Sequence, residues 1–500
     1  MTRILLSVHG AVWGIPMLVL ILWVGLRITV KTGFAQFRLL PEALTEFFRK
    51  FRKRDCASGV SPFRALCTAL GATVGTGNIV GVAGAICLGG PGAVFWMWVC
   101  GLIAMGTKFA EATLAVRYCE RVGGETVGGP MYMILHGMGE KWRSLGTVYC
   151  CFGLIASFGV GNMAQVNAVI SGINSVLAPA GGPESLRRNL GIGLILSVLI
   201  GSVLMGGANR IGASAELLVP FASVFYIVLC SSVLLLRRNE LGNAFRSIVQ
   251  GAFSPEAVTG GAVGTAFVAL RVGCSRGIFT NEAGMGTASM AHAAAAVRHP
   301  VEQGLMGIVE VFLDTIVLCT LTAMVILVSG VPVPYGTDGG GMLTVTAFSS
   351  VLGKGVAITL AAALCCFAFA SVLGWGLYGM RCVQFLFGPA AWEAFAAVQT
   401  AVVILGSVLN TETIWLLSEL FNGLMAVPNL MILAALTPEL GRLTKEYTKK
   451  SGGRAAEGGH YANFHQCQPL RAFPYEKVPS LRGGGGKAGK ENLSSEHRST

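Results

Sequence analysis

The chain is poor in charged residues. Of its 500 residues, 12% are Asp, Glu, Lys or Arg, whereas 53% are hydrophobic. Soluble domains contain about 25% charged residues, so a soluble fold of this composition would leave a large apolar surface in water. A bilayer removes that cost, because lipid surrounds the outer side chains. The composition therefore predicts an all-α membrane protein with the lipid bilayer as a partner.

Several other patterns are missing as well. The apolar runs are continuous. A transmembrane β-barrel would instead show segments of about ten residues in which apolar and polar positions alternate. The 14 cysteines form no CxxC pair, and several lie inside apolar stretches, so we interpret them as small hydrophobic residues. No HExxH motif occurs. We expect neither a cofactor nor an enzymatic activity.

The net charge of +12 does not indicate nucleic-acid binding, because the basic residues cluster beside apolar runs. One such cluster follows the first apolar run and consists of Arg49, Lys50, Arg52, Lys53 and Arg54. Lys and Arg are enriched in cytoplasmic loops, so we expect this loop to be cytoplasmic in a multi-pass protein of the bacterial inner membrane. If successive loops then alternate between the two sides of the membrane, Arg237, Arg238 and Arg246 would lie outside, against this enrichment.

A membrane-spanning helix needs about 20 mostly apolar residues, and about eleven segments meet that requirement. They cover roughly residues 10–30, 62–88, 92–117, 144–177, 189–207, 211–236, 262–295, 300–330, 353–380, 391–409 and 412–436. We predict a peripheral helix at 1–35, a basic cytoplasmic loop at 36–60, two repeats of five spans at 61–237 and 261–437, and a disordered cytoplasmic tail at 441–500.

Two of these spans contain too much glycine for uninterrupted helices. Residues 69–81 read ALGATVGTGNIVG, and residues 273–286 read GCSRGIFTNEAGMG. Each Gly costs about 1 kcal/mol relative to Ala inside a helix. Irregular backbone at membrane depth is tolerated where it faces protein or water. Two such segments at corresponding places of two halves indicate an inverted-repeat transporter, although glycines that serve packing alone are an alternative.

At these segments the chain resembles the alanine/glycine:cation symporter family, whose fold is similar to the five-plus-five inverted repeat of leucine-type transporters. The matching strings are GTGNIVGVAGAICLGGPGAVFWMW at 75–98, GGPMYM at 128–133, SRGIFTNEAGMGTASMAHAAA at 275–295, HPVEQGL at 299–305, VFLDT at 311–315 and FAFASVLGWGLYG at 367–379. The resemblance covers roughly residues 10–440.

The resemblance implies a site at the first interrupted helix. The implied substrate-binding residues are Thr73, Gly75, Gly77, Asn78, Gln165, Ser371 and Trp375. The implied cation-binding residues are Gly75, Thr76, Asn78 and Ser371. The family usually has threonine where Ser371 stands, so the hydroxyl is kept and a methyl group is lost. Trp375 would close over a small side chain and limit substrate size.

Charged residues inside spans are expensive and are usually paired or functional. We expect Arg276, Glu282 and Asp314 to form a structural or gating ion pair, which for the first two requires a break in the helix between them. Lys108 and Glu111 are expected near a membrane interface.

The resemblance implies Na⁺-coupled symport of a small neutral amino acid, alanine or glycine, by alternating access. Na⁺ serves as the coupling ion, since hydroxyls and freed carbonyls supply oxygen ligands. A proton-coupled symporter and a non-transporting amino-acid sensor of the same fold are the alternatives. The exact substrate, the ion stoichiometry and the oligomeric state stay open.

Overall fold

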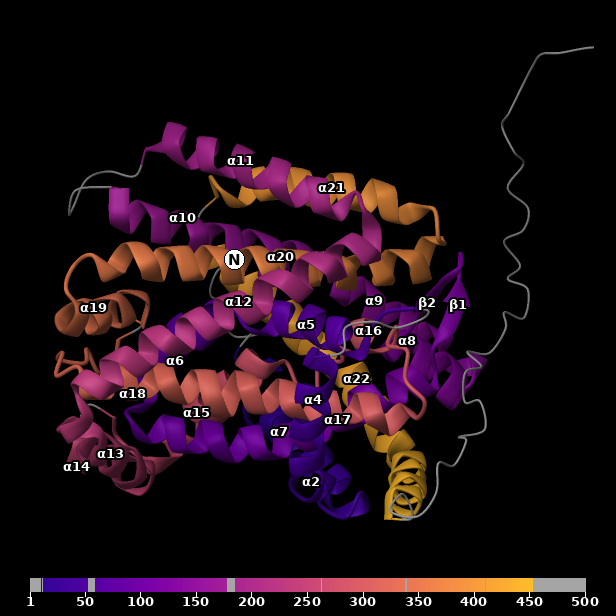
Figure 1. The fold of residues 1–500 in the computed structure, drawn as a ribbon, viewed down its shortest axis with the longest axis horizontal. Helices are drawn as coiled ribbons and strands as arrows, with labels where there is room; N and C mark the ends of the chain where they lie inside the picture. The colour runs from indigo at the N-terminus through magenta and orange to yellow at the C-terminus, as the bar shows by residue number, and fades with distance from the viewer. Residues whose placement is uncertain are drawn as a thin grey trace, which may run out of the picture.

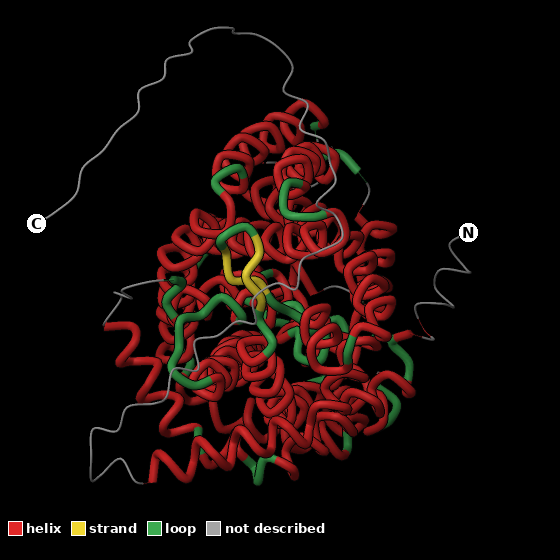
Figure 2. The backbone as a smooth tube through the Cα atoms, turned by 90° about the vertical axis from the view of Figure 1, so that its right-hand side faces the viewer, coloured by secondary structure: helices red, strands yellow, loops and turns green. Residues whose placement is uncertain are grey.

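The structure is a computed structural model that describes residues 10, 12–52, 59–177, 185–261, 263–337, 340–409 and 411–452. The described chain is helical apart from one antiparallel hairpin, β1 (Glu120–Val122) with β2 (Glu125–Val127). This hairpin lies on the side of the molecule that faces the viewer in Figure 2. The predicted all-α class is confirmed.

Each of the eleven predicted spans coincides with helix. In chain order the helices are α2 (Ile15–Lys31); α5 (Pro62–Thr73) with α6 (Val82–Gly89); α7 (Gly92–Arg117); α9 (Arg143–Phe158) with α10 (Ala164–Leu177); α11 (Leu186–Leu204); α12 (Gly207–Leu236); α15 (Ala266–Asn281) with α16 (Ser289–His292); α17 (Pro300–Val311) with α18 (Thr320–Val328); α20 (Val356–Phe387); α21 (Ala391–Gly406); and α22 (Thr411–Gly452).

Length and hydropathy separate these helices into two groups. Within the described residues, seven are long and apolar enough to cross a membrane, and the bent pair α5–α6 makes an eighth. Helices α2, α15 and α21 have 17, 16 and 16 residues, a little short of the roughly 20 that a full span takes. The predicted count of eleven therefore includes three short helices.

Two layers of helices lie on opposite sides of the molecule, with α5 and α12 between them (Figure 1). One layer contains α10, α11, α20 and α21, which contact one another, and the other contains α7 with α2, α13, α15 and α17 packed on it. Contacts also join α6 to α15, α7 to α17, α10 to α20 and α11 to α21. Each pair joins corresponding spans of the two predicted repeats. The contacts therefore support the division into two repeats, which itself stays a prediction.

The outer surfaces of α11 and α12 are apolar. Ile195 and Val198 on α11 are 64% and 71% exposed, and Leu217 and Leu235 on α12 are 75% and 72% exposed. Large apolar side chains with this exposure would be costly in water. They suit helices that face lipid.

The segment predicted as a basic loop at 36–60 is largely helical. It contains α3 (Ala35–Arg38) and α4 (Leu40–Arg52), with Lys53 and Arg54 outside the described residues. Ala43 is buried and Phe47 lies against Phe63 of α5, whereas Arg49 is exposed. The connection is therefore not an irregular loop, because Arg49, Lys50 and Arg52 belong to an amphipathic helix; its cytoplasmic position stays a prediction.

The predicted tail also begins later than expected. Helix α22 continues through residues 441–452, where Leu443 is buried and the Tyr447 hydroxyl donates a hydrogen bond to Glu42 of α4 (2.6 Å). This hydrogen bond joins the last turns of α22 to α4. The rest of the predicted tail, 453–500, lies outside the described residues.

Besides α3 and α4, three further described helices fall between the predicted spans. They are α13 (Leu241–Phe253), α14 (Pro255–Thr259) and α19 (Gly340–Leu352), and α8 (Pro130–Met133) is a single turn after the hairpin. Helix α13 packs on α7 at a point of close approach, since a Cβ on Gly92 would lie 2.1 Å from the Gly251 carbonyl. Such contacts explain part of the glycine content.

Candidate functional site

The first glycine-rich span is interrupted as predicted. Helix α5 ends at Thr73, Val74 is extended (φ −76°, ψ 102°), and the chain resumes as a π-helical turn, Gly77–Gly81, that leads into α6. The two pieces are bent by 52°. The interruption leaves backbone groups at residues 74–77 outside a regular helix.

Asn78 closes this interruption. Its Oδ1 accepts a hydrogen bond from the Gly75 N–H (3.0 Å), and its Nδ2 donates to the Asp314 carboxylate (2.7 Å) and to the Asp314 carbonyl (3.2 Å). Asp314 lies in a second π-helical segment, Phe312–Cys319, between α17 and α18. The amide therefore joins two irregular segments, both buried.

The other predicted residues meet Gly75 from two directions. The Thr76 hydroxyl donates to Gln165 Oε1 of α10 (3.4 Å), and the Ser371 hydroxyl of α20 donates to the Gly71 carbonyl (3.0 Å). A Cβ on Gly75 would lie 2.8 Å from Ser371 Oγ and 3.6 Å from Gln165 Oε1. Position 75 thus has room for glycine and little more.

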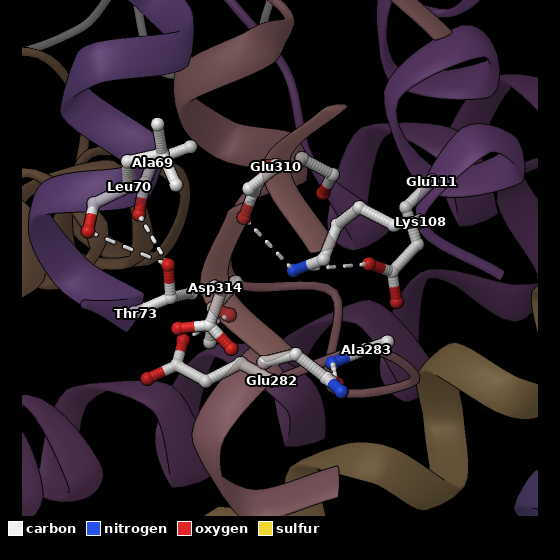
Figure 3. Close-up of polar contacts among 12 residues, drawn as sticks. Ala69, Leu70, Thr73, Lys108, Glu111, Glu282, Ala283, Glu310 and Asp314 are labelled. Carbon is white, nitrogen blue, oxygen red and sulfur yellow. Dashed lines mark hydrogen bonds and ion pairs between the residues drawn. The ribbon is translucent and has the colours of Figure 1, made fainter. Parts of the chain in front are cut away.

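Thr73 is placed differently. Its hydroxyl donates to the carbonyls of Ala69 and Leu70 in its own helix (3.3 and 3.4 Å; Figure 3). This is ordinary back-bonding of a helical threonine. Thr73 borders the interruption without contacting the other predicted residues by a side-chain hydrogen bond in the described structure.

The second glycine-rich span is also interrupted. Helix α15 ends at Asn281, Glu282 adopts a left-handed conformation (φ 51°), and the next helical turn, α16, begins at Ser289. Gly284 and Gly286 have φ of 95° and 79°, a region that favours glycine. This loop makes the break.

The two interruptions adjoin each other. A Cβ on Gly77 would lie 3.3 Å from Thr280 Cγ2, and the π-helical turn Gly77–Gly81 contacts α15. Asn281 donates to the Thr315 hydroxyl (3.1 Å), which in turn donates to Asp314 (2.9 Å). Asp314 is therefore hydrogen-bonded to both broken segments, directly to Asn78 and through Thr315 to Asn281.

A buried carboxylate holds the second loop. Glu111 Oε1 on α7 accepts hydrogen bonds from the N–H groups of Gly284 (2.9 Å) and Gly286 (3.1 Å) and from Asn429 Nδ2 of α22 (2.8 Å). The Tyr149 hydroxyl donates to the Met285 carbonyl (3.1 Å). Glu111 therefore supplies an acceptor that the loop backbone lacks internally.

Lys108 compensates the charge of this carboxylate. Its Nζ lies 3.2 Å from Glu310 Oε1 and 3.9 Å from Glu111 Oε2 (Figure 3). Glu310 Oε2 in turn lies 2.7 Å from His292 Nε2. These side chains are at most 1% exposed. The position of Lys108 and Glu111 near a membrane interface stays a prediction, but the structure shows both side chains fully buried, and their three-residue spacing on an apolar helix was the available signal of an ion pair.

The predicted ion pair among Arg276, Glu282 and Asp314 is wrong. Arg276 lies 3.7 Å from Glu419, whereas Glu282 accepts hydrogen bonds from Thr287 (2.7 Å) and Trp375 (3.1 Å). The helix does break after Asn281, but the turn at Glu282 directs its carboxyl group toward α20 and away from Arg276.

A family model described as the sodium:alanine symporter family matches residues 1–459 of the chain. An uncharacterized transporter of Haemophilus influenzae is 39% identical over 89% of this chain and 96% of its own length. The sodium/alanine symporter AgcS of Methanococcus maripaludis is 38% identical with the same coverage, and the probable sodium/glutamine symporter GlnT of Bacillus subtilis is 35% identical over 89% of this chain and 90% of its own.

A solved structure shares the fold. The crystal structure of MhsT in complex with L-phenylalanine superposes with a TM-score of 0.53 at 17% identity, and covers 79% of this chain and all of that chain. Two interrupted, adjoining helices inside this fold and the match over nearly the whole sequence agree. The chain belongs to the sodium:alanine symporter family, as a multi-pass membrane transporter and not an enzyme.

Proposed function

We propose that this chain carries a small neutral amino acid, alanine or glycine, into the cell together with Na⁺ by alternating access. The observation that carries the proposal is the contact of Asn78 with both Gly75 and Asp314 at the adjoining helix breaks. It gathers oxygen atoms and freed main-chain groups at one buried place, which is the arrangement that ion-coupled transporters use for substrate and ion.

The proposed cation ligands are the Gly75 carbonyl, the hydroxyls of Thr76 and Ser371, and the Asn78 side chain. Oxygen atoms of this kind suit a hard cation. The Asp314 carboxylate, 2.7 Å from Asn78, adds a negative charge beside them. A buried cation lowers the electrostatic cost of that carboxylate, and so the geometry favours a positive ion close to Asp314.

The proposed substrate residues are Thr73, Gly75, Gly77, Asn78, Gln165, Ser371 and Trp375. The start of the Gly77–Gly81 turn offers backbone N–H groups to a substrate carboxylate. Gln165 and Ser371 offer polar groups, and Trp375 supplies an apolar wall. The names of two relatives point to alanine and to glutamine, and in this chain we assign the limit on side-chain size to Trp375.

Uptake into proteoliposomes tests the proposal. We expect saturable accumulation of radiolabelled alanine when a Na⁺ gradient is imposed, and none when choline replaces Na⁺. Accumulation driven by a proton gradient in the absence of Na⁺ would instead support the proton-coupled symporter. Binding of alanine without any accumulation would support the sensor.

Asn78→Ala tests the position of the site. The variant loses the acceptor for Gly75 and the donor to Asp314, so we expect no uptake from a protein that still elutes as a folded species. Asn243→Ala is the matched control, since Asn243 is exposed on α13 and bonds Glu240. Normal uptake by Asn78→Ala would place the site elsewhere.

A further inference from the structure

Glu282 occupies a backbone conformation that suits glycine. Its φ is 51° and its ψ is 21°, and among the described residues Phe34 is the one other non-glycine residue with positive φ. A left-handed residue other than glycine is strained, and such strain persists where the surroundings require that side chain. Gly284 and Gly286 in the same loop are glycines, so position 282 departs from its neighbours for a reason that lies in its carboxyl group.

Both oxygens of this carboxyl group are used. Oε1 accepts a hydrogen bond from the indole N–H of Trp375 (3.1 Å), and Oε2 accepts one from the Thr287 hydroxyl (2.7 Å). Thr287 lies at the far end of the same loop, two residues before α16. Glu282 therefore links both ends of the second helix break to α20, in a place where its residue is 4% exposed.

The indole is confined from the opposite side as well. A Cβ on Gly161 would lie 2.3 Å from Trp375 Cβ and 2.4 Å from its Cγ. Gly161 belongs to the π-helical turn Gly159–Met163 that precedes α10. Trp375 is fully buried between this turn and the second break, and its ring also lies edge-on to Tyr378, with ring centroids 5.7 Å apart.

This confined indole stands beside the proposed substrate residues. Trp375 follows Ser371 by one turn of α20, and Gly161 precedes Gln165 by about one turn, so the same two elements supply the polar contacts and the apolar wall. Ser371 and Gln165 both lie close to position 75. A displacement of the indole would therefore act on the turns of α20 and α10 that carry Ser371 and Gln165.

We propose that Glu282 is a positioning residue for Trp375, and that by fixing the indole it sets the largest amino-acid side chain the transporter accepts. The inference rests on the proposed function, since it assigns a size limit to the same substrate site. It also explains why a strained glutamate is retained in a loop where glycine would be free of strain.

Three variants separate this role from simple support of the loop. Glu282→Gln keeps the reach of the side chain and can still bond both Trp375 and Thr287. Glu282→Asn tolerates the left-handed backbone well but is shorter by one methylene and cannot reach the indole. Trp375→Phe keeps an aromatic ring and removes the N–H donor.

The measurement uses Na⁺-driven uptake of labelled alanine. The concentration of unlabelled glutamine that halves this uptake is divided by the concentration of unlabelled alanine that does so, and the quotient is the ratio compared between variants. Glu282→Asn and Trp375→Phe are each expected to lower this ratio by about tenfold, because one methylene more or less in a hydrophobic pocket already changes discrimination by about 10–200-fold. Glu282→Gln should keep the wild-type ratio. The double variant Glu282→Asn/Trp375→Phe should lower the ratio no further than either single variant, because both break the same contact.

A wild-type ratio in folded Glu282→Asn overturns the inference, and so does a wild-type ratio in Trp375→Phe if the asparagine variant does not fold. Melting temperatures of the single and double variants in detergent provide a readout without transport. Non-additive shifts in melting temperature support the Glu282–Trp375 contact. Absence of Na⁺-driven uptake in the wild type would contradict the proposed function and would leave this readout of the contact intact. Additive shifts count against the contact.

Discussion

The surroundings of Gly75 show how strictly one position in the site is defined. The Gly75 N–H donates a hydrogen bond to Asn78 Oδ1, and a Cβ on Gly75 would point toward Ser371 and Gln165. Nearby glycines are less confined: a Cβ on Gly81 would lie 3.9 Å from Thr280 Cγ2, an ordinary van der Waals contact. The two positions stand six residues apart, so the effect of an added methyl group can be compared within one short segment.

Gly75→Ala should lower the initial rate of Na⁺-driven alanine uptake by about 10²-fold, since its Cβ would lie 2.8 Å from Ser371 Oγ and a displacement of about 1 Å in a site can cost that much. Gly81→Ala should transport at the wild-type rate. Both variants are measured in proteoliposomes at matched protein content. Equal rates for the two would show that Ser371 does not border the transport site.

Lys108→Met should destabilise the protein by about 3–5 kcal/mol, because it leaves the buried carboxylates of Glu111 and Glu310 without their cation. Arg49→Ala is the control. Arg49 is 61% exposed in its pair with Glu46, and such surface pairs contribute about 0–1 kcal/mol. Thermal melting in detergent measures both. A small shift for Lys108→Met would mean that the carboxylates find another partner.

Sequence reasoning named several residues that the structure brings together, but it paired few of them correctly. Asn78 stood out as an amide in a broken membrane segment, whereas Gln165 and Ser371 were implied by the family resemblance; their role in transport stays a prediction. Asp314 is separated from Asn78 by 236 positions in the chain, and no local pattern reports a contact of that range. Glu282 was assigned to Arg276 by proximity in sequence, whereas the left-handed turn directs it to Trp375.

At the scale of elements, the two helix interruptions were the most predictable features. Glycine clusters weaken a helix locally whatever its neighbours are, so residues 69–81 and 273–286 broke as expected. Helix α4 and the end of α22 were missed because each is stabilised by residues far away in the chain. Helix α4 packs mainly on α17, and Tyr447 of α22 bonds Glu42 and lies against His299. Long-range packing of this kind overrides local composition.

The crossing of α7 and α15 gives a prediction at this scale. A Cβ on Gly273 would lie 2.3 Å from the Ala93 carbonyl oxygen and 2.8 Å from Trp96 Cβ, so Gly273→Ala should separate the helices and destabilise the protein by about 1–3 kcal/mol. Gly191→Ala on α11 meets nothing within 4 Å and should stabilise by up to about 1 kcal/mol. Melting temperatures in detergent compare the two, and a stable Gly273→Ala would show that α15 shifts freely on α7.

At the scale of the whole molecule, the contacts divide the helices into two layers. The layer of α7, α15 and α17 is joined internally by the Lys108, Glu111 and Glu310 network. Among the described residues, the hydrogen bond from Trp375 to Glu282 joins this layer to α20, and Ser371 of α20 also donates to Gly71 of α5. A buried charge network is harder to break than a single hydrogen bond, so we expect motion between the layers rather than within one.

Electron paramagnetic resonance distances between genetically encoded spin labels test this expectation. Leu194 on α11 and Phe267 on α15 lie in different layers, whereas Phe245 on α13 lies in the same layer as Phe267; all three are 49–54% exposed. Addition of Na⁺ and alanine should change the 194–267 distance by about 2 Å or more and leave the 245–267 distance unchanged. A change confined to the 245–267 pair would locate the motion inside the charged layer and contradict its rigidity. Because both pairs share the label at 267, a local rearrangement of α15 would alter both distances and is thereby separated from movement of one layer past the other.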